Sequence, residues 1–98
     1  MVAYVINDME VTDTALLEEY KKLSPATVAQ YGGRLLARGG RIEVLEGTWS
    51  PTRLVIIEFP SVERARAWVE SVEYAAAKAL RRRASRSNLV VVEGAPVG

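Results

Sequence analysis

The segment RLVIIEF, residues 53–59, decides the fold because it is apolar without interruption from Leu54 to Ile57. A short apolar run bounded by turn residues is typical of a buried β-strand. Successive side chains of a strand point to opposite faces of its sheet, so this run predicts a sheet that is apolar on both faces. Residues 2–6 and 90–92 share the same uninterrupted apolar character and are expected in the same sheet.

A helix is expected between a first strand at residues 2–7 and the glycine pair at residues 32–33. Thr12 or Asp13 can cap it, because a side-chain oxygen there can accept a hydrogen bond from a free backbone N–H. Pro25 predicts a kink or a restart, since proline lacks the N–H that a helix interior needs. The glycines end the helix because glycine readily adopts the left-handed conformation.

The region after these glycines is expected to form a β-hairpin. Residues 34–46 are predicted to be one strand with a bend or bulge at Gly39-Gly40, and residues 47–52 form the turn into 53–59. Placing Glu46 opposite Arg53 pairs Val44 with Val55, Ile42 with Ile57 and Arg41 with Glu58. The predicted helix-covered face then carries Ile42, Val44, Val55, Ile57 and Phe59, and the other face carries Arg41, Glu43, Leu54, Ile56 and Glu58.

The last third of the chain is predicted to contain a second helical region and a final strand at residues 89–92. Ser61 is the expected cap, and the apolar stripe consists of Ala65, Trp68, Val69 and Val72. Ser71 is expected to start a further helix that runs toward Arg83. The element order predicts an α+β, ferredoxin-like βαββαβ fold with a four-stranded antiparallel sheet and helices on one face. We expect residues 1–94 to form one domain and residues 95–98 to form a loose tail.

A sheet that is apolar on both faces needs a second cover, because helices on one side shelter only one face. Each aliphatic side chain left in water forfeits roughly 1.5–3 kcal/mol. A handful would forfeit on the order of 10 kcal/mol, which is comparable with the whole stability of a small domain. We therefore expect a homodimer through the sheet face. The five residues after Glu93 are too few to cover that face instead.

The charge balance excludes an overall attraction to nucleic acid or to anionic membranes, because 13 basic residues meet 12 acidic ones. Lys78, Arg81, Arg82, Arg83 and Arg86 form the one strong cluster. We expect a solvated helix end there. Nucleic-acid binding is unlikely, because the cluster lacks neighbouring aromatic residues and an extended basic surface. No segment is long enough to span a bilayer and no secretory signal is recognised, so a cytoplasmic location is expected. The lack of cysteine fits that expectation.

The absence of histidine and cysteine limits the chemistry that the chain can perform. It excludes Ser-His-Asp and Cys-His arrangements, histidine-ligated haem and an ordinary zinc site. No cofactor and no metal are expected. Any catalysis would use carboxylates, tyrosines, arginines or backbone groups.

Glu58 and Arg53 are the two weak catalytic candidates. Glu58 lies in an apolar run and is either a general base or a structural partner of Arg41 or Arg38, and the second reading is favoured. Arg53 is either an anion-binding group or the partner of Glu46. The candidate walls of an apolar ligand cavity between helices and sheet are Tyr31, Trp49, Trp68 and Tyr74, with Tyr20, although such aromatic residues more often fill a core.

Several stretches resemble the uncharacterised domain-of-unknown-function family 1330. They are residues 31–33, 36–40, 45–53, 58–61 and 67–74. That family is similar to the dimeric α/β-barrel superfamily, in which two ferredoxin-like domains pack sheet against sheet, so the resemblance implies the same dimer. The superfamily includes cofactor-free monooxygenases, lactone isomerases and haem-binding enzymes. The family often has tyrosine and proline where this chain has Val69 and Val72, so no role of that tyrosine hydroxyl is carried over.

These observations favour a homodimeric domain that binds a small apolar or aromatic molecule without a metal or haem. Such a domain could also transform the molecule that it binds. Two alternatives stay open. The first is a non-enzymatic interaction or structural module whose aromatic residues are only core. The second is a weak nucleic-acid binder that uses the basic end of the last helix.

Overall fold

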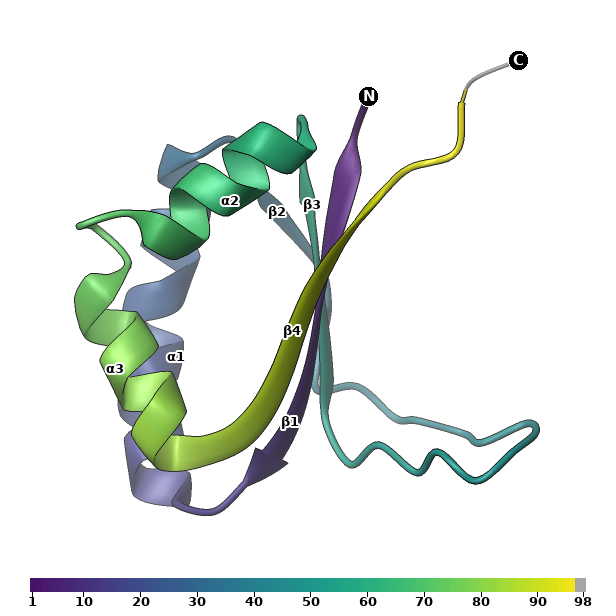
Figure 1. Cartoon of the computed structure of the whole chain (residues 1–98). Helices are drawn as coiled ribbons and strands as arrows, with labels where there is room; N and C mark the ends of the chain where they lie inside the picture. Colours follow the sequence, from purple (N-terminus) through teal and green to yellow (C-terminus); the bar gives the residue numbers. More distant parts are fainter. Residues whose placement is uncertain (97–98) are drawn as a thin grey trace.

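The computed structural model describes residues 1–96 and shows one layer of helices against one face of a four-stranded sheet (Figure 1). The strands are all antiparallel, in the order β2–β3–β1–β4, which confirms the predicted ferredoxin-like fold. Of the expected tail, residues 97–98 lie outside the described residues. The elements in chain order are β1 (Ala3–Val11), α1 (Thr14–Gln30), β2 (Arg34–Arg38), β3 (Leu54–Phe59), α2 (Val62–Glu70), α3 (Ala75–Ala84) and β4 (Ser85–Glu93).

Helix α1 begins at the predicted cap and runs through its proline. The Asp13 carboxylate accepts a hydrogen bond of 3.0 Å from the N–H of Leu16. The predicted restart at Pro25 is wrong, because α1 continues to Gln30. Buried residues on both sides of the proline pack against the rest of the protein and hold the helix together, since tertiary packing supplies most helical stability. The helix ends at Gln30, just before the glycine pair as expected, and Gly32 has a φ of 76°.

The predicted hairpin register is wrong, because β2 ends at Arg38 and residues 40–53 are a loop that extends away from the sheet (Figure 1). Gly39 causes this early end. Its φ of 68° turns the chain, and its N–H donates to the C=O of Leu54 at 3.0 Å. The observed Cα partners are Arg34 with Glu58, Leu35 with Ile57, Ala37 with Ile56 and Arg38 with Val55, with a bulge at Leu36 instead of at the glycine pair.

The side chains of β3 lie on the predicted faces of the sheet, although the residues expected to pair with β3 lie elsewhere. Val55, Ile57 and Phe59 are buried under the helices, and Leu54, Ile56 and Glu58 lie on the open face with intermediate exposure. The four residues expected to pair with them, Arg41, Ile42, Glu43 and Val44, lie in the extended loop and belong to neither face of the sheet.

The core is built around an aromatic cluster under α2 and α3. The rings of Trp68 and Tyr74 have centroids 4.1 Å apart, and Phe59 lies 5.4 Å from Trp68. The hydroxyls of Tyr20 and Tyr74 share a hydrogen bond of 2.8 Å that joins α1 to the start of α3. Burial raises the pKa of the Tyr74 hydroxyl well above its usual value, so Tyr74 stays neutral in the folded protein.

The apolar stripe predicted for α2 includes one residue too many, because Val72 is 83% exposed. Helix α2 ends at Glu70, and the Ser71 hydroxyl donates to the C=O of Trp68 at 2.7 Å. The same oxygen accepts from the N–H of Tyr74 at 3.1 Å, so Ser71 bridges the turn between the two helices. The prediction that Ser71 starts the next helix is wrong, because α3 begins at Ala75 and its cap position is Tyr74, without a side-chain cap hydrogen bond. This turn leaves Val72 on the outside.

The Tyr20–Tyr74 hydrogen bond yields a testable prediction. Either Tyr20→Phe or Tyr74→Phe should lower the free energy of unfolding by about 1–3 kcal/mol, because each leaves a buried hydroxyl without its partner. The double variant should lose clearly less than the sum of the two single variants. Urea denaturation of the four proteins measures this, and additive losses would show that the two hydroxyls do not interact.

Candidate functional site

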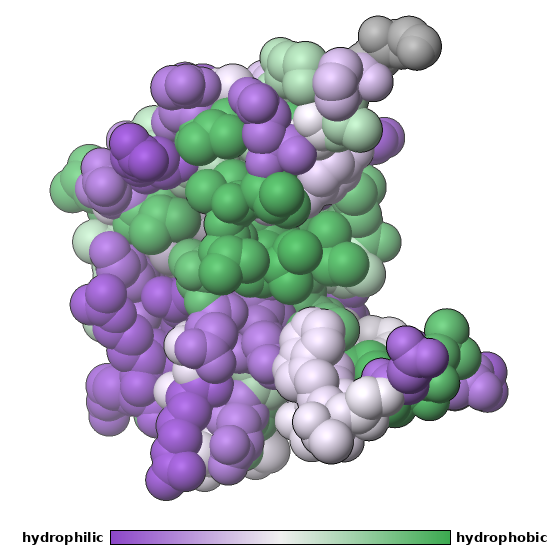
Figure 2. Space-filling model, turned by 45° about the vertical axis from the view of Figure 1, so that its right-hand side comes forward, coloured by the Kyte–Doolittle hydropathy of each residue, from purple (hydrophilic) through white to green (hydrophobic). Residues whose placement is uncertain are grey.

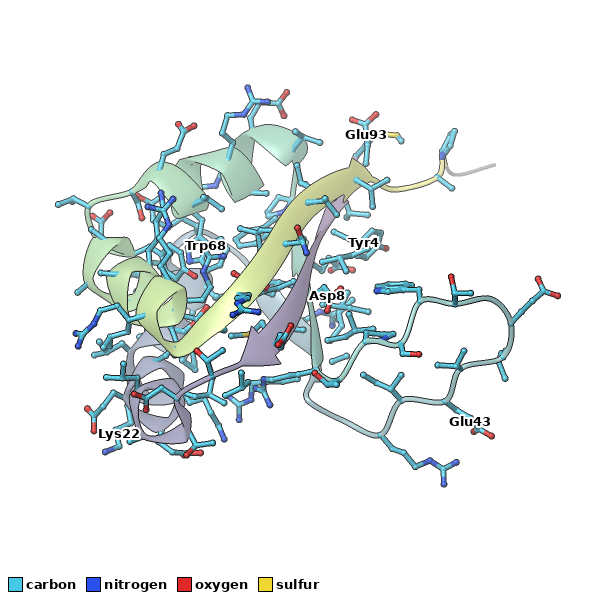
Figure 3. All side chains as sticks on the ribbon, turned by 60° about the horizontal axis from the view of Figure 1, so that its bottom comes forward. Tyr4, Asp8, Lys22, Glu43, Trp68 and Glu93 are labelled. Atoms are coloured by element: carbon cyan, nitrogen blue, oxygen red, sulfur yellow. The ribbon has the colours of Figure 1, made fainter. Side chains whose placement is uncertain are left out.

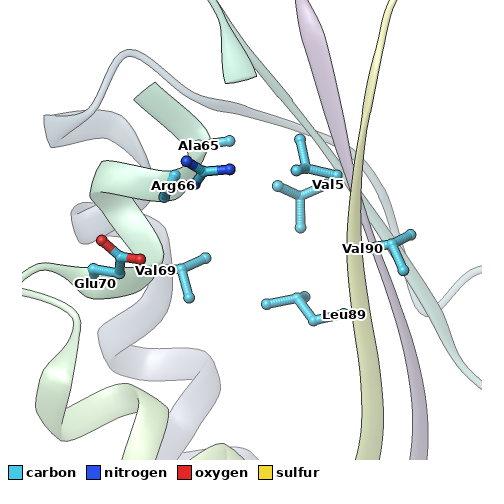
Figure 4. Close-up of a pocket in the computed structure, with 8 residues that line it drawn as sticks. Val5, Ala65, Arg66, Val69, Glu70, Leu89 and Val90 are labelled. Carbon is cyan, nitrogen blue, oxygen red and sulfur yellow. The ribbon is translucent and has the colours of Figure 1, made fainter. Parts of the chain in front are cut away.

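A cleft of about 180 Å³ lies between α2 and the β1–β4 side of the sheet. Figure 4 shows Val5, Val69 and Leu89 pointing into it from the sheet and the helix, and Val90 pointing to the opposite face of the sheet. The remaining side of the cleft is open because β4 is an edge strand. Its other lining residues are Ala65, Arg66, Glu70 and Val91.

The local sequence explains why this cleft exists. The Ser61 hydroxyl accepts a hydrogen bond of 3.1 Å from the N–H of Arg64 and fixes the start of α2. Ala65 then presents only a methyl group toward the sheet, where a larger side chain would fill the space. Arg66 and Glu70, one turn apart on the helix, are the only ionisable groups among the lining residues. The cleft therefore offers an aliphatic interior with one positive and one negative group.

The four aromatic residues considered as ligand walls lie in three separate places. The structure brings Trp68 and Tyr74 together inside the core. Tyr31 lies at the surface, where its hydroxyl donates to the Glu73 carboxylate at 2.8 Å and the Arg64 guanidinium lies 5.1 Å from its ring centre. Trp49 is 60% exposed in the extended loop, and its indole N–H donates to Asp8 at 3.0 Å.

The two catalytic candidates lie on opposite faces of the sheet. Glu58 lies on the open face, 3.3 Å from the Arg34 guanidinium, and therefore pairs with Arg34 instead of with Arg41 or Arg38. Arg53 lies on the helix side, where its guanidinium packs against Gly39. No ion pair joins Arg53 to Glu46 in the described part of the chain. Glu58 and Arg53 therefore cannot act together within one protomer.

The basic cluster is divided between the interior and the surface. Arg81 is buried, at 5% exposure, and its Nε and Nη1 have no hydrogen-bond partner among residues 1–96. Arg86 lies 3.8 Å from Glu10. The expected solvated helix end is therefore wrong for Arg81, because the inward face of α3 runs through Ala77, Arg81 and Ala84. A nucleic acid would meet fewer free cations than the sequence suggests.

The sheet face without helices is apolar at its centre. Figure 3 shows Tyr4 on the side away from the helices, whereas Trp68 lies between the helices and the sheet. Figure 2 shows a band of apolar side chains across the middle of the molecule, between the polar helices and the extended loop. Val90 and Val92 are 57% and 50% exposed. The open face consists of Tyr4, Ile6, Leu54, Ile56, Val90 and Val92, flanked by Asp8 and Glu58.

The sequence did not single out Val5 or Leu89 as cleft residues, because both have the pattern of ordinary core positions. Their role arises from the separation of α2 and β4, which no local signal encodes. No group of three or more potential metal ligands occurs within residues 1–96. Within the same range, every helix is too short or too polar to cross a membrane.

Comparisons with known proteins agree with the architecture. The profile of a domain of unknown function, DUF1330, matches residues 2–95. No curated protein matches the sequence significantly.

Three solved structures share the fold. A protein of unknown function from Rhodopseudomonas palustris has a TM-score of 0.75 and 18% identity, over 98% of this chain and 84% of that chain. A dimeric protein of unknown function and ferredoxin-like fold from Bacteroides fragilis has a TM-score of 0.66 and 14% identity, over 95% of this chain and 96% of that chain. SnoaB, a cofactor-independent oxygenase from Streptomyces nogalater, has a TM-score of 0.57 and 13% identity, over 98% of this chain and 94% of that chain. Identities this low show the fold alone.

The Tyr31–Glu73 contact generates a prediction about pH. The Tyr31 hydroxyl holds the pKa of the Glu73 carboxyl below its usual value, so its contribution to stability is present at neutral pH and is lost as pH falls through the folded-state pKa. In Tyr31→Phe the pKa of Glu73 should rise toward 4.5, as an NMR titration of the carboxyl carbons would show. Tyr4→Phe is the control. An unchanged Glu73 pKa in Tyr31→Phe would contradict the assignment.

Proposed function

This chain belongs to the DUF1330 family, and we propose that it is a homodimeric domain that binds a small, mainly apolar molecule in the cleft between α2 and the sheet. The observation that carries the proposal is the cleft itself. Its volume of about 180 Å³ compares with the roughly 150 Å³ that is enough for benzene in an engineered apolar cavity. Small-molecule sites are typically concave and apolar with a few polar groups, which describes this cleft.

The composition of the lining favours binding over a specific reaction. Because Arg66 and Glu70 are the only ionisable lining residues, any proton transfer in the cleft would involve the Glu70 carboxylate. Arg66 would orient a polar end of the ligand at the rim. One structural neighbour is described as a cofactor-independent oxygenase, and a reaction without metal or haem would suit a chain that has no histidine or cysteine.

The dimer part of the proposal rests on the open face of the sheet. Val90, Val92 and their neighbours would be sheltered if a second copy packed sheet against sheet, and the strands of two such sheets lie within about 30° of each other in aligned packing. The neighbour from Bacteroides fragilis is described as dimeric, which supports self-association. The extended loop at residues 40–53 leaves the sheet on this side, so it would contact the partner.

The dimer can be tested with a charge placed on the open face. Val92→Lys puts one ammonium group from each copy into the proposed interface, and a charge buried there without a partner is strongly unfavourable. Sedimentation velocity at micromolar concentration should show a dimer for the wild type and a monomer for Val92→Lys. Val72→Lys makes the same substitution at a surface position outside the interface and should stay dimeric. A monomeric wild type would refute the dimer.

The cleft can be tested by filling it. A neutral aromatic probe such as indole should raise the thermal midpoint of the wild type, and at about 100 times its Kd it adds about 2.7 kcal/mol to the free energy of unfolding. Val69→Trp places a ring in the cleft and should abolish this shift, whereas Val72→Trp adds the same ring outside it and should keep the shift.

If indole and compounds of similar size give no shift with the folded wild type, the cleft does not bind apolar molecules. That result would favour the alternative of a purely structural dimer. An equal shift in wild type and Val69→Trp would place the binding site elsewhere in the protein.

A further inference from the structure

A second hollow, the cationic crevice, lies between α1 and the β2–β3 side of the sheet. Lys21 from α1, Arg38 from β2 and Arg53 before β3 all line it, and Asn7 from β1 lines it as well. It is small, at about 20 Å³, which is room for about one or two water-sized groups. Leu89 lines both this crevice and the apolar cleft, so the two hollows are neighbours on the helix-covered face of the sheet.

The lining of the cationic crevice is basic, and among the residues that the structure describes only one of its three cations is in an ion pair. None of its lining residues is acidic. Within residues 1–96, neither Arg38 nor Arg53 forms an ion pair, and Lys21 pairs only with Glu18, a surface carboxylate at 3.2 Å. Three like charges around one small space repel each other, and an anion between them would remove that repulsion.

Two buried polar atoms in the cationic crevice also have no hydrogen-bond partner in the part of the chain that the structure describes. Asn7 is only 3% exposed, and its side-chain oxygen is unpaired. The Nε of Arg53 is buried and unpaired as well. Buried polar atoms in proteins almost always have partners, and ordered waters and ions count among these partners. The Asn7 amide can present either its oxygen or its NH₂ to the crevice, because the two ends occupy nearly the same space.

The backbone leaves room for the Arg53 guanidinium at the mouth of the cationic crevice. Gly39 has a φ of 68°, and a Cβ built on it would collide with the Arg53 guanidinium. The glycine therefore serves two purposes: it ends β2 and it leaves room for the arginine beside the backbone. Arg53 is consequently held on the helix side of the sheet, beside Asn7 and Val55.

We propose that the cationic crevice is a binding site for a small carboxylate. The planar fork of a guanidinium matches the two oxygens of a carboxylate, and a space for one or two water-sized groups admits these two oxygens more readily than a tetrahedral phosphate. Arg53 and Arg38 bind the negative charge of the carboxylate, and Lys21 adds to the positive electrostatic potential. The Asn7 NH₂ donates a hydrogen bond at the inner end of the crevice. This site is distinct from the proposed apolar cleft and does not depend on it.

The experiment uses acetate as the probe and neutral acetamide as its matched control, in the full-length protein at constant ionic strength. In ¹H–¹⁵N NMR spectra, acetate should shift the Asn7 side-chain amide and Arg53 Nε–H signals saturably. Acetamide should bind about tenfold more weakly or worse, because charge-assisted hydrogen bonds are roughly twice as strong as neutral ones. The absence of a saturable acetate shift, or equal binding of both probes, would overturn the proposal.

Asn7→Asp provides a second test because it supplies a carboxylate from the chain itself. This variant should raise the denaturation midpoint and abolish the acetate response at Arg53 Nε–H. Asn88→Asp adds the same charge on the open face and should keep the acetate response. Arg53→Gln should weaken acetate binding about tenfold, whereas Arg83→Gln, on the exposed side of α3, should not. An acetate response that persists unchanged in both Asn7→Asp and Arg53→Gln would refute the site.

Discussion

The two-sided apolar character of the central strands is the constraint on which the rest of the structure depends. β1 and β3 are the middle strands of the sheet, and each carries aliphatic side chains on both faces. The helices bury one face completely at Val5 and Ile57, but leave Ile6 and Ile56 partly exposed on the other. A single layer of helices therefore completes only half of the burial that these two strands require.

The sequence predicted the faces of the sheet better than the partners of its strands. Alternation along β3 is a local property, so the burial of Val55, Ile57 and Phe59 followed from it directly. The pairing of β2 with β3 is not local. It depends on the left-handed conformation of Gly39 and on the space that Arg53 needs beside it, and together they end the strand eight residues earlier than predicted.

The same distinction explains which site residues could be found. A helix cap is visible within a few residues of sequence: Ser61 was identified directly, and Asp13 was one of two alternatives, with Thr12. The cleft is formed by residues as distant in sequence as Val5, Val69 and Leu89, each of which has an ordinary core pattern. Arg81 illustrates the opposite error. Composition placed it in a solvated basic cluster, whereas the periodicity of α3 turns it inward with Ala77 and Ala84.

The two faces of the sheet differ in what they can recognise. The open face offers aliphatic side chains over a broad surface, which suits a second copy of the chain. The helix-covered face contains two small hollows that meet at Leu89, one aliphatic and one cationic. A chain without histidine or cysteine has few reactive groups. Its selectivity among ligands would therefore come from this contrast between an apolar wall and a cluster of guanidinium groups. Placing both hollows on one face leaves the other face free for self-association.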